Sequence, residues 1–164
     1  MDSIFNRVSV RKYQDKLVEP EKVEQILRAG MQAPSAYNLQ PWEFFVIENA
    51  DIKAKLAVSN NVLQAAKNSP LLILTAYREA TKVPEYNQIS LSACMENMWL
   101  EATSLGLGAV WLGIAPFTEH MQKVDEIVNL PAGLKSFALL SVGYPLRDKK
   151  VSDRFDQTRI HYVK

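Results

Sequence analysis

The segment from 87 to 105 is apolar on nearly every side and constrains the fold more than any other part of the sequence. Its pattern predicts one long helix that stops at Gly106, because glycine readily adopts the left-handed conformation that ends helices. A helix with so little polar circumference must be covered by protein on most sides. We therefore expect it at the centre of the domain, with a helix of a second copy covering the surface that one small domain leaves bare.

Several short apolar segments, rich in β-branched and aromatic residues, are predicted to be strands, at 42–47, 71–76, 109–112 and 137–144. Helices are predicted around them, at 2–8, 20–30, 50–57, 61–67 and 118–129. Residues 159–163 are a candidate additional edge strand. This alternation predicts an α/β (α+β) fold with a mixed sheet of about four to five strands flanked by helices, in a single domain spanning 1–164. The order of the strands does not follow from the sequence.

Charge and cysteine content exclude several classes of protein. The formal net charge of +1 gives no large attraction to nucleic acid, and no apolar run approaches the ~20 residues that span a bilayer. The single cysteine, Cys94, cannot form an intrachain disulfide and is expected to be a core residue in a cytoplasmic, reducing setting. His120 and His161 are too isolated to indicate a metal site.

No known nucleotide-binding or nucleophile motif is present. Gly106-Leu107-Gly108 follows a predicted helix and precedes a strand, the reverse of the order in dinucleotide-binding folds. No side chain stands out as a catalytic acid, base or nucleophile. If the chain is an enzyme, its reactive atoms are expected to belong to a cofactor.

Polar side chains alternate near the N-terminus. Arg7, Ser9 and Arg11 occupy every second position, so an extended segment would direct all of them to one side. Two guanidinium groups and a hydroxyl suit a phosphate monoester. The alternative is a solvated basic turn.

A second polar segment, residues 34–42, lies between a predicted helix and a strand. Pro34 and Pro41 stiffen it, and Ser35, Asn38 and Gln40 between them could pair with the amide-like edge of a ring. The alternative is an ordinary turn that only connects the two elements.

These motifs together resemble the short members of the nitroreductase family. The resemblance comes from four segments in order, namely Arg-x-Ser-x-Arg-Lys-Tyr (7–13), Ala-Pro-Ser-Ala-Tyr-Asn-Leu-Gln-Pro-Trp-Glu-Phe (33–44), Leu-Gly-Leu-Gly-Ala-Val-Trp-Leu-Gly (105–113) and Val-Gly-Tyr-Pro (142–145). Each segment alone is a weak signal, but their order and spacing cover nearly the whole chain. The resemblance implies a homodimer that binds FMN between its subunits.

The resemblance also carries individual flavin contacts over to this sequence. Those implied on one subunit are Arg7, Val8, Ser9, Arg11, Asn61, Gln64, Leu112, Gly113, Ile114 and Arg154. The phosphate would be held by Arg7, Ser9 and Arg154, with Arg159 as a competing candidate for the last. Arg11 would lie by the pyrimidine edge, and a backbone N–H at Gly113 and Ile114 would meet flavin N5.

The other subunit would contribute its proline-bounded loop. Pro34, Ser35 and Asn38 are implied to reach the flavin across the interface, and Ala36 and Gln40 of the same loop are further expected contacts. Residues 154–164 are a candidate for exchange between subunits. Many relatives carry a basic residue where Gln64 stands, so this position departs from the family pattern.

The activity implied is the reduction of nitroaromatic, quinone or similar electron-poor molecules by NAD(P)H in a ping-pong scheme. FMN carries the chemistry, so no catalytic side chain and no metal are expected. The short segment 77–86 motivates an alternative, a flavin-binding sensor or carrier without turnover. A further alternative is a protein that binds the phosphate of another nucleotide.

Overall fold

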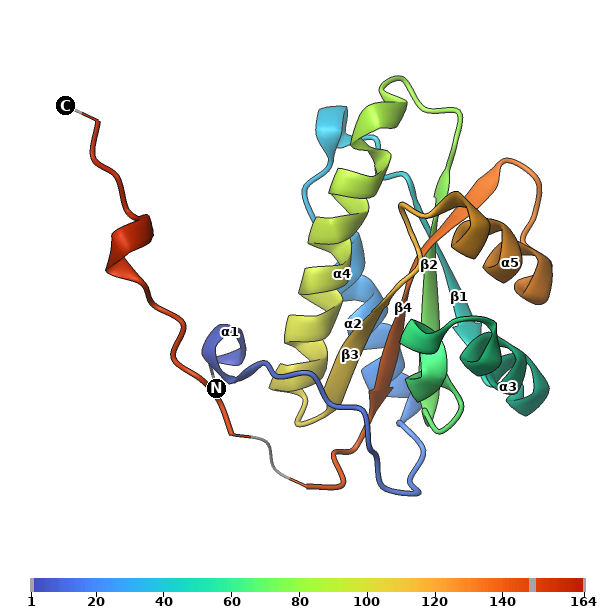
Figure 1. The fold of residues 1–164 in the computed structure, drawn as a ribbon, viewed down its shortest axis with the longest axis horizontal. Coiled ribbons are helices and arrows are strands. Elements are labelled where there is room, and N and C mark those ends of the chain that lie inside the picture. The colour runs from blue at the N-terminus through green and yellow to red at the C-terminus, as the bar shows by residue number, and fades with distance from the viewer. Residues whose placement is uncertain (1, 148–149, 164) are drawn as a thin grey trace.

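The computed structural model describes residues 2–147 and 150–163, which form an antiparallel sheet between two layers of helices (Figure 1). The strands are β1 (Trp42–Ile47), β2 (Leu71–Arg78), β3 (Gly108–Gly113) and β4 (Leu134–Gly143). The α-helices are α1 (Ser3–Asn6), α2 (Pro20–Met31), α3 (Ala50–Ser59), α4 (Asn87–Ser104) and α5 (Thr118–Val128). Short 3-10 helices are η1 (Ala36–Asn38), η2 (Asn61–Ala66), η3 (Pro84–Tyr86) and η4 (Gln157–Arg159).

The sheet has the strand order β1-β2-β4-β3, and each pair of neighbouring strands is antiparallel. The four strands expected from the sequence are confirmed, and the expected α+β class with them. From Leu71 to Tyr77 every residue of β2 is buried, because helices cover both faces of the sheet. β3 forms one edge of the sheet, a position that matters for the site.

The long apolar helix α4 packs against α2 and against one face of the sheet. Its end is closed by two hydrogen bonds, from Gly106 N–H to the Thr103 oxygen at 3.1 Å and from Leu107 N–H to the Ala102 oxygen at 2.9 Å. Gly106 has a φ of 75°, so the predicted helix stop is confirmed. One strip of α4 stays uncovered in the protomer, where Ile89 is 63% exposed.

Three segments, one of them in the middle of the chain, differ from the sequence-based expectations. The first helix covers only Ser3–Asn6, and β2 continues to Arg78 into the segment expected to be a loop. The expected edge strand at 159–163 is wrong, since these residues pair with no strand and follow η4 on an exposed arm. This arm, residues 150–163, extends away from the domain body (Figure 1).

None of the described helices combines the length and apolar character needed to span a bilayer.

Tyr144, directly after β4, is tied to the start of α2. Its hydroxyl lies 2.7 Å from both carboxylate oxygens of Glu19 and accepts a 2.6 Å hydrogen bond from Lys22 Nζ. The hydrogen bond from Tyr144 is the main cause that lowers the pKa of Glu19 to about 2, followed by a backbone hydrogen bond and the charges of Lys22 and Lys16. This cluster joins the last strand to the first long helix.

We expect Glu19→Gln to destabilise the protein at neutral pH and to lose this effect in acid. A carboxylate whose pKa is lowered by folding contributes stability above its ordinary pKa of 4.5, and this contribution disappears as the pH falls through about 2. Urea unfolding of wild-type and variant across this range measures the difference. Glu21→Gln, which removes a charge from the same first turn of α2, is the control. A deficit that is equal at both ends of the pH range would contradict the assignment.

Candidate functional site

The side chain of Arg7 is held in position by contacts within the protomer. Its guanidinium carbon lies 4.2 Å from the centre of the Trp99 ring, and its Nε lies 3.5 Å from Glu96 Oε1. Its side chain is only 15% exposed, although it carries a full charge. Among the described residues, Glu96 is its ion-pair partner, through Nε rather than through the two terminal nitrogens.

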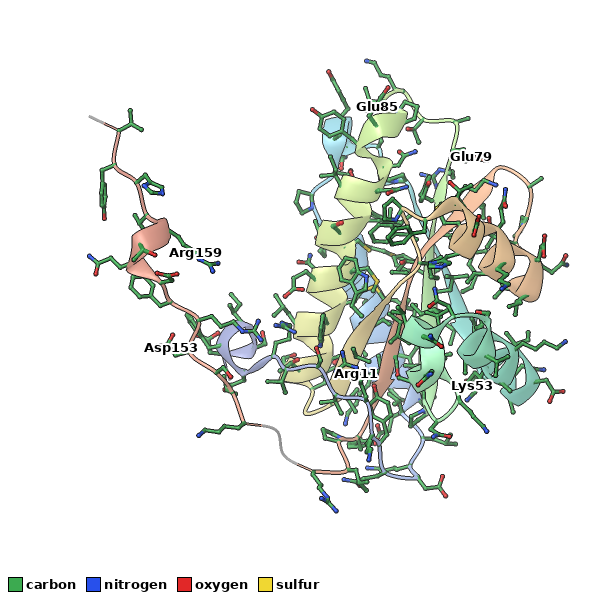
Figure 2. All side chains as sticks on the ribbon, in the orientation of Figure 1. Arg11, Lys53, Glu79, Glu85, Asp153 and Arg159 are labelled. Atoms are coloured by element: carbon green, nitrogen blue, oxygen red, sulfur yellow. The ribbon has the colours of Figure 1, made fainter. Side chains whose placement is uncertain are left out.

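A pocket of about 510 Å³ lies between the N-terminal segment and the C-terminal arm. Its lining residues are Ile4, Phe5, Arg7, Val8, Lys150, Val151, Ser152, Asp153, Arg154 and Phe155. It therefore brings together three of the residues singled out in the sequence, Arg7, Val8 and Arg154. Arg159 does not line it but lies farther out on the arm, paired with Asp156 at 3.1 Å (Figure 2).

The sequence reasoning missed Lys150 and Ser152 in this lining. Their proximity to Arg154 was the only signal, because a charged tail without periodicity gives no indication of which side chains face inward. Lys150 adds a further positive charge to the pocket, and Ser152 adds a hydroxyl. Among the described residues of the lining, Asp153 is the acidic one.

The segment between Arg7 and Arg11 is extended, which is one of the two alternatives that the sequence left open. Ser9 forms a parallel bridge with Ala109 of β3, and the Val10 N–H donates to the Ala109 oxygen at 2.9 Å. Val10 is 4% exposed, whereas Arg11 next to it is exposed. The segment is thus not a solvated turn but lies along the edge of the sheet, and Figure 2 shows Arg11 beside β3.

At the end of β3, backbone groups rather than side chains are accessible to a ligand. Leu112 and Ile114 are 2% and 0% exposed, so their side chains belong to the core. The Ile114 N–H donates to the Phe137 oxygen of β4 at 3.3 Å, and the oxygen of Ala109 points to the opposite edge, where it accepts from Val10. Successive residues of a strand direct their N–H and C=O groups to opposite edges. Gly113 is an even number of residues from Ala109, so its N–H points away from β4, off the edge of the sheet.

The chain has six glycines, and Gly113 differs from the other five. Gly106 and Gly133 have positive φ, and an added Cβ at Gly30, Gly108 or Gly143 would lie 2.6–2.7 Å from a neighbouring side chain. A Cβ at Gly113 would meet nothing within 4 Å, and its φ is ordinary. Neither conformation nor packing within the protomer explains this glycine. It leaves an open, flat surface beside an N–H that points outward.

Asn61 and Gln64 lie on η2, which packs against β3. Both side chains are exposed. They therefore lie at the surface, on an element that contacts β3.

The loop with Pro34 and Gln40 lies elsewhere in the protomer. The Ala36 N–H donates to Ser90 Oγ near the start of α4, at 3.4 Å, whereas Arg7 contacts Trp99 nine residues later. At 1.5 Å per residue this is a separation of about 13 Å along the helix. One protomer alone does not bring this loop to the Arg7 pocket.

The same loop is rigid and strained. Tyr37, Asn38 and Gln40 all have φ between 46° and 54°, a region that costs non-glycine residues energy. Ser35 holds the conformation, because its Oγ accepts from the Gln40 N–H at 2.9 Å and its oxygen accepts from the Asn38 N–H at 2.9 Å. Such over-determined strain is typical of ligand-binding loops and argues against a simple connecting turn.

The Nitroreductase family model matches the chain over residues 4–79 and 59–144. The chain belongs to the nitroreductase family. It is 36% identical to a candidate NADH dehydrogenase/NAD(P)H nitroreductase of Archaeoglobus fulgidus, with 98% of this chain and 95% of the relative covered. A crystal structure of a candidate NADH oxidase from Clostridium acetobutylicum is 45% identical, with a TM-score of 0.94 and 99% of each chain covered. An FMN-dependent nitroreductase of Clostridium difficile is 26% identical, with a TM-score of 0.91, 99% of this chain and 98% of that chain covered.

The single thiol of this nitroreductase-family chain has no role in the site. Cys94 is fully buried in α4, and burial raises the pKa of its thiol to about 12. The thiolate, which is the reactive form, is therefore disfavoured at neutral pH. Among the described residues, no three His, Cys, Asp or Glu side chains are placed to hold a metal ion.

Proposed function

We propose that the chain is an FMN-dependent NAD(P)H oxidoreductase that reduces nitroaromatic, quinone or similar electron-poor molecules, with its flavin bound between two copies. The observation that carries this proposal is Gly113, which leaves an open flat face and an outward N–H at the edge of β3 for no reason internal to the protomer. A planar ring with a hydrogen-bond acceptor fits such a face.

The phosphate of FMN is assigned to the pocket of Arg7 and Arg154. Both arginines line it, and the Arg7 fork is already oriented by Trp99 and Glu96. Arg forks match phosphate oxygens closely. Ser9 and Val8 complete this end of the site, and Arg154 is favoured over Arg159 because Arg159 lies outside the pocket and pairs with Asp156.

The ring is assigned to the face between β3 and η2. The Gly113 N–H would hydrogen-bond to the ring, Asn61 and Gln64 would border it, and Arg11 would supply positive charge at its pyrimidine edge. Leu112 and Ile114 support this face through the core and contact the ring only by backbone, because their side chains are buried. No side chain of the chain is assigned an acid–base role.

Bound FMN supplies the hydride chemistry, and the chain supplies binding and electrostatics. Arg11 places a cation where negative charge develops on reduction, which favours the reduced state. The open face admits NAD(P)H and the acceptor in turn, a ping-pong order. The absence of a side chain at Gly113 keeps the backbone close to the reacting part of the ring.

The second copy is required to complete the site. Pro34, Ser35, Ala36, Asn38 and Gln40 lie too far along α4 to serve the Arg7 pocket of their own protomer, so they are assigned to the flavin of the partner. The arm adds a second reason, since Phe155, Ile160 and Tyr162 are 74%, 43% and 83% exposed on a segment that leaves its own domain. A partner subunit would cover these apolar side chains.

The enzyme assignment is tested by reconstituting the purified protein with FMN and following NADH and NADPH oxidation with a quinone. We expect a yellow protein whose steady-state rate clearly exceeds that of the same concentration of free FMN. A yellow protein without acceleration would indicate a carrier or sensor. A protein that takes up no flavin would overturn the proposal as a whole.

The dimer is tested at the uncovered strip of α4. Ile89→Glu places a charge on a side chain that is 63% exposed in the protomer, so the fold should survive while association and FMN binding are lost. Light scattering and flavin titration measure the two effects. Leu17→Glu, at a side chain that is 81% exposed in a loop, is the matched control and should leave a flavin-binding dimer. A dimeric Ile89→Glu protein would contradict this placement of the interface.

A further inference from the structure

Two of the residues assigned to the cofactor, Ser9 and Arg11, belong to a strap, residues 9–14, that crosses the edge of the sheet. β3 and β4 place Gly108 and Gly143 opposite one another beneath it. A Cβ at Gly108 would lie 2.6 Å from Val10, and one at Gly143 would lie 2.9 Å from the Tyr13 ring. The glycine pair therefore forms a notch in which Val10 and Tyr13 are seated.

The hydroxyl of Tyr13 is the fixed point of this strap. It lies 2.7 Å from the oxygen of Val10, 3.0 Å from the oxygen of Ser141 and 2.9 Å from Ser141 Oγ. Ser141 Oγ continues to Ser69 Oγ at 2.9 Å, so the hydroxyl is anchored in a buried polar chain. Burial raises the pKa of Tyr13 to about 12, so the hydroxyl keeps its proton throughout the physiological range.

These contacts fix the backbone between two side chains of the site. Val10 is held on its N–H by the Ala109 oxygen at 2.9 Å and on its oxygen by Tyr13. Ser9 and Arg11 flank it and project from the other side of the extended segment. Any movement of Val10 would therefore displace both neighbours together.

We propose that Tyr13 is a positioning residue of the flavin site, whose hydroxyl holds Val10 so that Ser9 and Arg11 are preorganised for FMN. The inference rests on the proposed function. Preorganisation favours binding because the chain loses less freedom when the ligand arrives. Tyr13 touches neither substrate nor cofactor and acts only through its neighbours.

The test is Tyr13→Phe, which keeps the ring in the notch and removes only the hydroxyl. The matched control is Tyr144→Phe, because that hydroxyl is also hydrogen-bonded but ties β4 to Glu19 and Lys22 of the α2 region. Three quantities are measured, namely the FMN Kd by titration of apoprotein, the midpoint potential of the bound flavin, and the hydrogen-exchange rate of the Val10 amide without flavin.

For Tyr13→Phe we expect faster exchange at Val10, an FMN Kd about five- to tenfold weaker, in line with the loss of one hydrogen bond, and a more negative midpoint potential. The potential shifts because Arg11 is less well placed to stabilise the reduced flavin. Tyr144→Phe should change none of these three quantities. A Tyr13→Phe protein with wild-type Kd and potential would overturn the inference, even if its thermal stability fell.

The two proposals fail in different ways. Wild-type protein that binds no FMN, yet shows a Val10 amide protected by Tyr13, would overturn the flavin function and with it the assigned purpose of the strap. Wild-type protein that binds FMN, with a Tyr13→Phe variant of unchanged affinity and potential, would overturn only the role of Tyr13. Hydrogen exchange requires no flavin and therefore separates these cases.

Discussion

Gly113→Val is expected to abolish tight FMN binding while the apoprotein folds as before. An added Cβ at this position meets no atom within 4 Å in the protomer, and β-branched residues suit strands. The same side chain would occupy the face assigned to the flavin ring. Forcing extra methyl groups into a packed contact costs roughly 1–3 kcal/mol, which corresponds to a Kd weakened by about 5- to 150-fold. Flavin titration measures the loss.

Circular dichroism and thermal unfolding of the apoprotein provide the control for this prediction. We expect the melting temperature of Gly113→Val to equal or exceed that of wild-type, since glycine in a strand is costly. Gly113→Ala, with a smaller side chain, should bind FMN with intermediate affinity. If valine at this position leaves the FMN Kd unchanged, the ring does not lie against β3.

Arg7→Ala should produce the second large loss, a weakening of FMN binding by about 10- to 150-fold. A hydrogen bond to a charged group contributes roughly 1.5–3 kcal/mol, which corresponds to this range of Kd, and the Arg7 fork would offer such a bond to the phosphate. Arg7→Lys keeps the charge but removes the planar fork and the flat contact with Trp99, so an intermediate loss is expected. The FMN Kd of each variant is measured at low and moderate ionic strength.

Arg28→Ala is the matched control for Arg7. Arg28 is an exposed arginine on α2 that pairs with Glu24 at 2.5 Å, outside the pocket, so its removal should not change FMN binding. The fold should survive Arg7→Ala because Glu96, the partner left behind, is 46% exposed and can be solvated. Equal affinities for the Arg7 and Arg28 variants would place the phosphate elsewhere.

The elements of the fold that could be predicted are those with strong local patterns. The core strand at 71–76 and the helix ending at Gly106 follow from continuous apolar residues and a glycine stop. The strand order β1-β2-β4-β3 does not, because pairing between distant segments leaves no periodic signal in either. Residues 159–163 show the limit most clearly, since β-branched and aromatic residues formed no strand where no neighbour was available to pair with them.

The candidate site divides in the same way. Alternation at Arg7, Ser9 and Arg11 left an extended segment and a solvated turn open, and the bridge between Ser9 and Ala109 of β3 selects the extended one. Lys150 could not be found, because its place in the pocket depends on where the arm runs. The roles of the individual residues toward FMN remain predictions, to be decided by the variants above.

The outstretched arm has a consequence for how the protein would acquire its colour. If the loop at Ser35 reaches the flavin only in a pair of chains, and the partner covers the apolar side chains of the arm, then occupancy by flavin follows mass action in the polypeptide itself as well as in the ligand. When a stock of flavin-loaded protein is diluted, the fraction of protein with bound flavin should then fall more steeply than a one-to-one equilibrium allows. Newly made chains at low abundance would remain colourless until they meet.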